Sequence, residues 1–397
     1  MTDPVNIVIV NQHTNNYGDD AAGIALVERC FSELSAGRVD VFYIWDRGQG
    51  GLPINDDRVH HHFVPVLSGK DDQRANLFKA ALWQLIQSRH AHDQLRPLVA
   101  AARAADFVLV SPAGSNIGIY KDWMYLFVLL AMVRCGVRPI FFQNTVGQSN
   151  SKIFDRVAKY VLARSELFVR EQSSKEWLAR QHLHSYLGVD TALLLDPVAN
   201  AVTRDVIAVV PTALGNWHRD FRGADERGLW RDVVANSVAK AAVSEGLRVR
   251  VVPHLYGPQA EPEQLQQLAD ALAGQGCVVE IAPVASLSDY VAELAKSHIV
   301  VSMRYHGLIL AALNGVPCVS LAYENKMLEA ARYLDQQQLS ISVKDLSVER
   351  LDSLLDLALR SRDAVAQRTA DAVQAVRTVA LGPLLSMQAH LRRRSGR

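Results

Sequence analysis

Short apolar runs alternate with longer amphipathic segments along most of the chain. Apolar runs of about four to eight residues between turn signals are typical of buried parallel strands, and apolar residues at three- and four-residue spacing favour helices. Strands that alternate with helices predict an α/β fold built on doubly wound parallel sheets. The predicted strands cover residues 6–11, 39–45, 107–111, 139–143, 167–169, 206–210, 248–252, 277–281, 299–303 and 318–321.

Helical periodicity fills most of the segments between these strands, and Asp19 and Ser288 have the side chains expected of helix N-caps. The predicted helices cover residues 20–34, 72–90, 94–104, 122–135, 153–165, 174–180, 229–245, 262–274, 289–297, 307–314, 327–334 and 348–381.

The alternation ends near residues 196–205 and then begins again, and a chain of 397 residues fits two domains of about 150 residues each. We predict an N-terminal domain over residues 1–198 and a C-terminal domain over residues 199–347. The helices of residues 348–397 are expected to pack back on the N-terminal domain. Ligands of such sheets bind outside the carboxyl ends of the strands, so the site is expected in a cleft that the two domains face.

Basic side chains follow two successive strands within residues 297–335. Arg304 and His306 come directly after one predicted strand, and Lys326 comes after the next. Helix N-termini at this edge of a sheet also favour negative charge. The sequence therefore predicts a site for a small, multiply charged anion.

Polar side chains likewise follow the predicted strands of the N-terminal half. Asp19 lies beyond the first strand, and Asn116, Asn144 and Arg170 each follow a later one. Because these strand ends share one edge of the sheet, their side chains are expected to form the opposite wall of the cleft.

Composition excludes several classes of protein. With 42 Lys and Arg against 41 Asp and Glu, the net charge of +1 argues against nucleic-acid binding, which needs a clustered basic face. The four cysteines form no CxxC pair, so neither a zinc site nor a disulfide framework is expected. We expect no cofactor and no metal, and place His60-His61-His62 in an exposed strand or loop.

No segment predicts secretion or a membrane span. Residues 5–10 are too short for a signal peptide and lack a basic flank, and the most apolar run, residues 123–133, is well below the ~20 residues that a span requires. A cytoplasmic protein, with or without contact at the inner face of the membrane, is expected. The basic tail at residues 392–397 is either a solvated terminus or a contact for anionic lipid.

Several short motifs carry a family resemblance. Ser302-x-Arg304-x-His306 followed by AALNGVPCVSLAYENK resembles the polysaccharide pyruvyl transferases, and so does Asn16-Tyr17-Gly18-Asp19-Asp20-Ala21. Further matching pieces are Gln143-Asn144-Thr145-Val146-Gly147, Val169-Arg170-Glu171 and Gly188-Val189-Asp190. The resemblance implies two Rossmann-like domains in a GT-B-like arrangement. It also implies transfer of pyruvate from phosphoenolpyruvate to a sugar, as a ketal across two hydroxyls.

Three loops depart from the family pattern. Pro112-Ala113-Gly114 stands where a glycine triplet is typical, Gln148 stands where a proline is common, and the loop after Pro253-His254 lacks the paired acids often found there. These loops are expected to shape the acceptor site, so the acceptor is open: a polysaccharide sugar, free or lipid-linked.

The implied chemistry suggests a role for each candidate. Arg304 and Lys326 are expected to bind the carboxylate and phosphate of phosphoenolpyruvate, with Arg170 completing the anion site. His306 either donates a hydrogen bond to the phosphate or acts as general acid, and Asp19 is the candidate base for an acceptor hydroxyl. The other expected substrate-binding residues are Asn16, Gly18, Asn116, Asn144, His254 and Tyr323.

Structural roles and other functions stay open. A GT-B glycosyltransferase that uses a nucleotide sugar is the alternative enzyme, and a non-catalytic sugar- or phosphate-binding protein is the alternative of another class. The candidates can also be purely structural: Arg304 in a salt bridge, His306 as a satisfied histidine, Asp19 as a cap, Arg170 paired with Glu171 and Tyr323 in packing.

Overall fold

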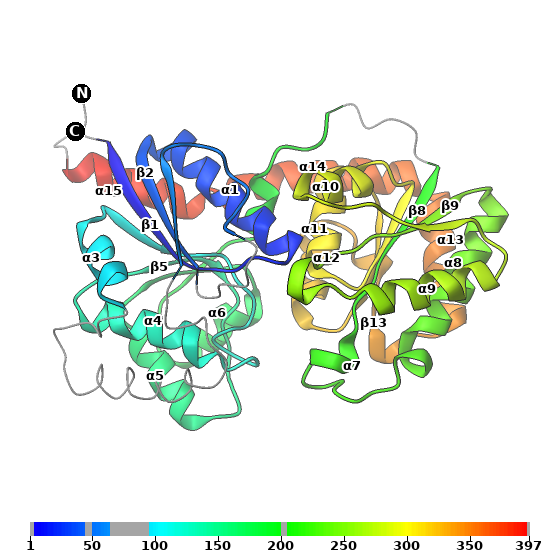
Figure 1. Cartoon of the computed structure of the whole chain (residues 1–397), viewed down its shortest axis with the longest axis horizontal. Helices are drawn as coiled ribbons and strands as arrows, with labels where there is room; N and C mark the ends of the chain where they lie inside the picture. The colour runs from blue at the N-terminus through cyan, green and yellow to red at the C-terminus, as the bar shows by residue number, and fades with distance from the viewer. Residues whose placement is uncertain (1–3, 44–49, 64–94, 200–204, 395–397) are drawn as a thin grey trace. The chain divides into compact units, whose positions relative to one another are not determined.

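The structure is a computed structural model that describes residues 4–43, 50–63, 95–199 and 205–394, and it contains two parallel sheets (Figure 1). Each sheet is the centre of one compact unit. The first unit comprises Met1–Thr14, Ala22–Leu194 and Val379–Arg397, and the second comprises Asn15–Ala21 and Leu195–Thr378. The predicted α/β fold with two doubly wound parallel sheets is confirmed, while the predicted helix at residues 72–90 lies outside the described residues.

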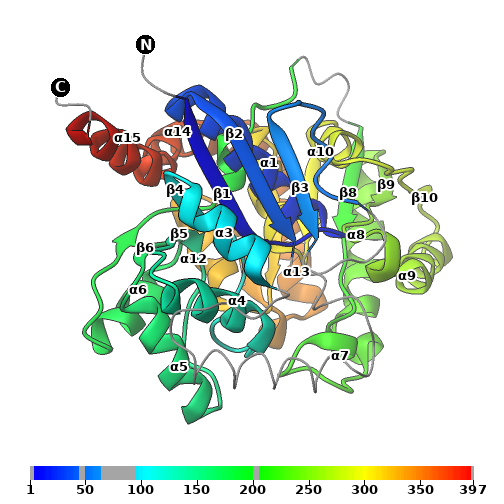
Figure 2. The ribbon, with the colours of Figure 1, turned by 60° about the vertical axis from the view of Figure 1, so that its left-hand side comes forward.

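The sheet of the first unit has seven strands in the order β3-β2-β1-β4-β5-β6-β7, all parallel (Figure 2). The order reverses between β1 and β4, which makes this pair the switch point of the sheet. The strands are β1 (Val5–Gln12), β2 (Ala36–Tyr43), β3 (Val59–Phe63), β4 (Phe107–Val110), β5 (Ile140–Asn144), β6 (Glu166–Val169) and β7 (Tyr186–Leu187).

Helices cover both faces of this sheet because its central strands are continuous apolar runs, whose successive residues point to opposite faces. Val8 and Val10 of β1 join the core beneath one set of helices, and Ile7 and Ile9 join the core on the other face. The first set is α3 (Arg96–Ala104), α4 (Trp123–Arg134), α5 (Lys152–Leu162) and α6 (Gln172–Arg180), and the second face takes α1 (Tyr17–Leu34) and α15 (Gly382–Arg394).

The sheet of the second unit has six parallel strands in the order β10-β9-β8-β11-β12-β13, with its switch point between β8 and β11. The strands are β8 (Val206–Val210), β9 (Arg248–Val251), β10 (Val279–Ile281), β11 (Ile299–Ser302), β12 (Cys318–Ala322) and β13 (Ser340–Ser342). The helices are α7 (Leu214–Trp217), α8 (Asp232–Glu245), α9 (Pro262–Gly274), α10 (Leu287–Ala295), α11 (Tyr305–Leu313), α12 (Asn325–Tyr333), α13 (Val348–Arg360) and α14 (Arg362–Ala380).

Helix α11 is the best-buried helix of this unit, since every one of its nine residues is buried. A helix that is apolar all round can only lie inside a domain. It packs against β11 and β12, so the basic residues at its beginning are held by a rigid element at the carboxyl edge of the sheet.

Two predicted helix caps are wrong. The backbone N–H of Gly18 donates to the side-chain oxygen of Asn16 at 2.9 Å, so Asn16 caps α1 and Asp19 lies within its first turn. The cap of α10 is Ser286, whose hydroxyl accepts from the backbone N–H of Asp289, and not Ser288. In both cases the chain enters the helix two or three residues earlier than the cap-like side chain suggests.

The ends of the chain also differ from expectation. Residues 348–381 form two helices, because α13 ends at Arg360 and α14 begins at Arg362. The expected frayed tail contributes residues 392–394 to α15, and Pro383 near the start of that helix has the φ angle that a first turn needs. Strand β13, three residues long and only half-buried, was not predicted.

The three consecutive histidines lie on the edge strand β3, but they are half-buried and not exposed as expected. His62 is hydrogen-bonded to Asp40 at 2.6 Å, and His61 to the hydroxyl of Tyr43 at 2.8 Å. Among the described residues no group of three or more His, Cys, Asp or Glu is arranged to hold a metal ion. In the same part of the chain, no helix is long and apolar enough to cross a membrane.

Candidate active site

Arg304 lies at the switch point of the second sheet, where β8 and β11 end side by side. Its backbone N–H donates to the hydroxyl of Ser302 at 3.0 Å, and that hydroxyl donates to the backbone oxygen of Arg304 at 2.9 Å. The guanidinium Nε donates to the backbone oxygen of Pro211, just beyond β8, at 3.1 Å. The Nη2 group is paired with Glu261. The side chain is thereby held in one orientation across the two strand ends.

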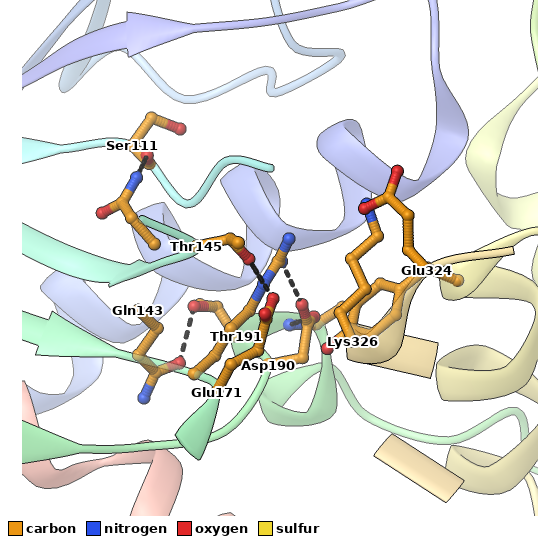
Figure 3. Close-up of polar contacts among 12 residues, drawn as sticks. Ser111, Gln143, Thr145, Glu171, Asp190, Thr191, Glu324 and Lys326 are labelled. Atoms are coloured by element: carbon orange, nitrogen blue, oxygen red, sulfur yellow. Dashed lines mark hydrogen bonds and ion pairs between the residues drawn. The ribbon is translucent and has the colours of Figure 1, made fainter. Parts of the chain in front are cut away.

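Lys326 lies at the end of the neighbouring strand, in the first turn of α12. Its ammonium is 2.9 Å from Oε2 of Glu324, a contact that Figure 3 shows for this pair. The other carboxylate oxygen of Glu324 lies 3.4 Å from Nε2 of His218. The backbone N–H of Asp220 donates to Nδ1 of His218 at 3.2 Å, so Nδ1 is an acceptor there and Nε2 is the ring nitrogen that faces the carboxylate. Glu324 therefore lies between Lys326 and His218, with one carboxylate oxygen toward each.

His306 is the second residue of α11, and its imidazole stacks on that of His254, with ring centroids 6.5 Å apart and planes 17° apart. The hydroxyl of Tyr290 is hydrogen-bonded to Nδ1 of His254 at 2.8 Å. Burial, reinforced by the positive charges of Arg304 and His306, holds the pKa of His254 well below its usual range. His254 is therefore a neutral partner beside the His306 ring.

Gly18 lies close to the ring of His306. A Cβ atom at Gly18 would be 2.0 Å from Nδ1 of His306, so only glycine fits at this position. The segment is fixed in the second unit by two backbone hydrogen bonds, from Tyr17 N–H to the oxygen of His254 and from Tyr256 N–H to the oxygen of Asn15, each 3.2 Å long. The start of α1 thus belongs to the site that contains His306.

Asp20 is the buried acid of this turn, with 1% of its surface exposed. The hydroxyl of Tyr256 donates to its Oδ2 at 2.7 Å, and among the described residues its Oδ1 has no hydrogen-bond partner. Burial, together with the charge of Asp19, raises the pKa of Asp20 to about 7 against the opposing effect of Tyr256. Sequence reasoning selected Asp19 and missed Asp20, because two adjacent aspartates give no signal of which one the fold buries.

Substitution of Asp20 by asparagine is expected to stabilise the protein above neutral pH. An acid whose pKa rises from about 4 when unfolded to about 7 when folded loses stability as the pH rises through this window, by up to ~4 kcal/mol for a shift of this size. Asparagine can still accept from Tyr256 but cannot ionise. Thermal melting from pH 4 to 9 should show a gain that grows with pH in Asp20→Asn and is absent in Asp19→Asn; equal, pH-independent curves would refute it.

The first unit has its own buried polar network where β5, β6 and β7 end. Nη1 of Arg170 pairs with Oδ2 of Asp190 at 2.5 Å, and both side chains are almost completely buried. Nε of Arg170 donates to the hydroxyl of Thr145 at 3.1 Å, and that hydroxyl is also bonded to Glu171. Figure 3 shows Thr145, Glu171 and Asp190 in this network, to which Arg170 is firmly held.

The amides of the first unit lie at the same edge. Nδ2 of Asn144 donates to the backbone oxygen of Ser111 at 2.7 Å and to the hydroxyl of Tyr125 at 3.0 Å. Nδ2 of Asn116 is 3.2 Å from Nε2 of His13. Gln143, at an irregularity of β5, has a φ of +57° and is held by Thr191 at 2.8 Å.

The structure therefore divides the predicted site residues between the two units. Four residues that lie close to the predicted ones were not predicted from the sequence. They are the acids Glu261 and Asp20 and the ring-bearing residues His218 and Tyr290. Tyr323 packs edge-on against Trp217 and His218. The second unit holds Arg304, His306, Lys326, His254, Tyr323, Asn16, Gly18 and Asp19, and the first unit holds Arg170, Asn116 and Asn144.

Two parallel sheets with polar residues at their carboxyl edges define a GT-B-like α/β protein, and solved structures agree. A putative UDP-N-acetylglucosamine 2-epimerase from Listeria monocytogenes has a TM-score of 0.62 at 14% identity, with 98% of this chain and 97% of that chain covered. HepE from Anabaena, in complex with UDP-glucose, has a TM-score of 0.59 at 13% identity, with 98% and 99% covered. Sucrose-phosphate synthase from Thermosynechococcus elongatus has a TM-score of 0.57 at 14% identity, with 98% of each chain covered.

The sequence itself matches the family described as polysaccharide pyruvyl transferase over residues 16–325. The chain belongs to this family. The matched region begins at the cap of α1 and ends at the first residue of α12, one residue before Lys326. A comparison with curated protein sequences gave no significant match.

Proposed function

We propose that the protein transfers pyruvate from phosphoenolpyruvate to a sugar of a polysaccharide or of its lipid-linked precursor, forms a pyruvate ketal and releases phosphate. Membership of the family supports the transferase class. One observation supports phosphoenolpyruvate as the donor: Arg304, His306 and Lys326 cluster at the ends of two adjacent strands of the second sheet.

Two glutamates pair with the cations of this cluster. Glu261 pairs with Arg304, and Glu324 pairs with Lys326. A buried cation without a counter-ion is costly, so these pairs keep the site charged and ordered before the substrate arrives. The carboxylate and phosphate of phosphoenolpyruvate then compete with the glutamates for the same cations, and guanidinium and ammonium groups are suited to both anions.

The proposed reaction begins at the double bond of phosphoenolpyruvate. Protonation of C3 leaves an oxocarbenium-like centre at C2, and one acceptor hydroxyl adds to C2 while losing its proton. The C2–O bond to phosphate breaks, and the second hydroxyl adds to C2 and loses its proton as the ketal closes. His306 is the proposed proton donor to C3 or hydrogen-bond donor to the phosphate, with the neutral ring of His254 beside it.

The acceptor is proposed to lie beside the first turn of α1. Asp19, one residue beyond the glycine that touches His306, is the proposed base for a hydroxyl, and Asn16 ends the loop that leads there. From the first unit we propose Asn116 and Asn144 as hydroxyl partners and Arg170 as a further contact for the donor anion. Tyr323 is proposed to line the donor site through its packing on His218.

The direct test is incubation of the protein with phosphoenolpyruvate and a panel of free and lipid-linked oligosaccharides. We expect phosphate release that depends on the acceptor, and a product whose mass has increased by one pyruvate less one water. Tight binding of both ligands with no phosphate release for any acceptor would favour a non-catalytic binding protein.

A glycosyltransferase that uses a nucleotide sugar is the second candidate, and the observation that favours it is the fold shared with UDP-sugar enzymes. The two candidates differ in the ligand that stabilises the protein. Phosphoenolpyruvate at about 100 times its Kd is expected to add ~2.7 kcal/mol to the free energy of unfolding, whereas UDP- and GDP-sugars are expected to add none. Thermal melting with each ligand is the measurement, and stabilisation by a nucleotide sugar alone would reverse the assignment.

A further inference from the structure

The first unit has a second site at the edge of the sheet opposite Arg170 and Asn144. A pocket of about 720 Å³ lies where β4, β5, β6 and β7 begin, and the last turns of α15 close one side of it. Phe107, Ile140, Glu166 and Tyr186 line it from the strands. A pocket of this volume is in the range that binds small molecules or lipid headgroups.

The rim of this pocket is basic. Arg138, in the loop before β5, and Arg393, on α15, line it and are exposed. Arg164 and Arg392 are exposed next to lining residues, and three histidines complete the lining: His182, His184 and His390.

Two carboxylates also line the pocket, and both accept hydrogen bonds from the protein itself. Oδ2 of Asp106 accepts from the backbone N–H of Asn6 at 3.1 Å, and Oε1 of Glu166 accepts from the hydroxyl of Ser386 at 3.2 Å. Among the lining side chains two arginines balance these two carboxylates, and the exposed Arg164 and Arg392 beside them in the sequence make the surroundings of the pocket positive, although the whole chain has a net charge of only +1.

The wall of the pocket is apolar. Leu162, Leu167 and Met387 line it below the charged rim, and Tyr186 is 50% exposed at its edge. An aromatic residue with one polar end beside arginines is typical of protein surfaces at the headgroup level of a membrane. A nucleic acid would instead require an extended basic groove.

We propose that this edge of the first unit binds the anionic surface of a membrane, with a phosphate-bearing headgroup seated in the pocket between Arg138 and Arg393. The proposed substrate-binding residues of the same unit, Arg170, Asn116 and Asn144, lie at the opposite end of its strands, so a bound membrane leaves that end accessible. The inference is independent of the reaction assigned above, because it rests on a different edge of the sheet.

Co-sedimentation of the full chain with vesicles tests the proposal. We expect binding to vesicles of phosphatidylglycerol mixed with phosphatidylcholine, and little binding to phosphatidylcholine alone. Each arginine near an anionic surface strengthens binding about fivefold, so Arg138→Glu combined with Arg393→Glu should weaken it by about 25-fold or more.

The matched control reverses two charges elsewhere on the same unit, Lys152→Glu with Arg156→Glu, both exposed on α5. It should bind within about threefold of the unaltered protein, with melting curves confirming that all variants are folded. No binding to anionic vesicles, or an equal loss in both double variants, would overturn the proposal. Displacement of the protein by millimolar inorganic phosphate at constant ionic strength would also overturn it, in favour of a site for a free anion.

Discussion

Replacement of His306 by alanine is expected to lower the rate of pyruvyl transfer by about 10²–10⁴-fold while the protein stays folded. The imidazole is on the second residue of a fully buried helix and lies against the ring of His254 and close to Gly18, so its position is fixed before substrate binds. Neither neighbour can replace it, because His254 is held neutral and Gly18 has no side chain. Phosphate release at saturating phosphoenolpyruvate and acceptor is the measurement.

Two variants sharpen this experiment. Arg304→Ala should also abolish turnover and in addition weaken phosphoenolpyruvate binding, since it removes a charge rather than a proton donor. His60→Ala, on the edge strand β3 of the first unit, is the matched histidine control and should retain full activity. Near-normal phosphate release in His306→Ala would mean that the reaction takes place elsewhere in the protein.

Replacement of Asp190 by alanine is expected to destabilise the first unit by about 3–5 kcal/mol. The substitution leaves the guanidinium of Arg170 buried without its 2.5 Å partner, and it also removes the acceptor for the backbone N–H of Ala192 at 2.9 Å. Thermal or denaturant unfolding is the measurement. The expected effect is on stability, so it does not require that Arg170 touch substrate.

A second substitution separates the lost pair from the lost volume. In Arg170→Met combined with Asp190→Ala no unpaired charge is left, so the double variant should be more stable than Asp190→Ala alone. Asp196→Ala is the surface control, because that aspartate is 87% exposed and its contact with Arg377 is 3.4 Å long; a change below about 0.5 kcal/mol is expected. A double variant less stable than Asp190→Ala would mean that other contacts of Arg170 dominate.

The strands of both sheets were predictable because parallel strands are covered on both faces and must be continuous apolar runs. Residues 206–210 and 299–303 illustrate this, since β8 and β11 occupy these runs almost residue for residue. Once the strands are placed, Arg304 and Lys326 must follow adjacent strand ends, so a basic cluster could be expected at the carboxyl edge of this sheet.

The partners of those cations were not predictable. Arg304 pairs with Glu261 across 43 positions of sequence, and the loop that carries Glu261 has no periodicity that would place it there. The buried role of Asp20 depends on Tyr256, which is 236 positions away. Such contacts arise from the path of loops between elements, whereas local patterns reveal only the elements themselves.

The short segment Asn15–Ala21 has a consequence for how the chain can be divided. Although it comes from the beginning of the sequence, it belongs to the second unit, where Gly18 touches His306 and Tyr17 is bonded to His254. The second unit is therefore not continuous in sequence. A fragment of residues 195–378 would lack the segment that packs against His306. Recombination that exchanges only the C-terminal half of the gene would combine His306 with a residue 18 from another protein. We therefore expect such chimaeras to retain the site only when that residue is also glycine.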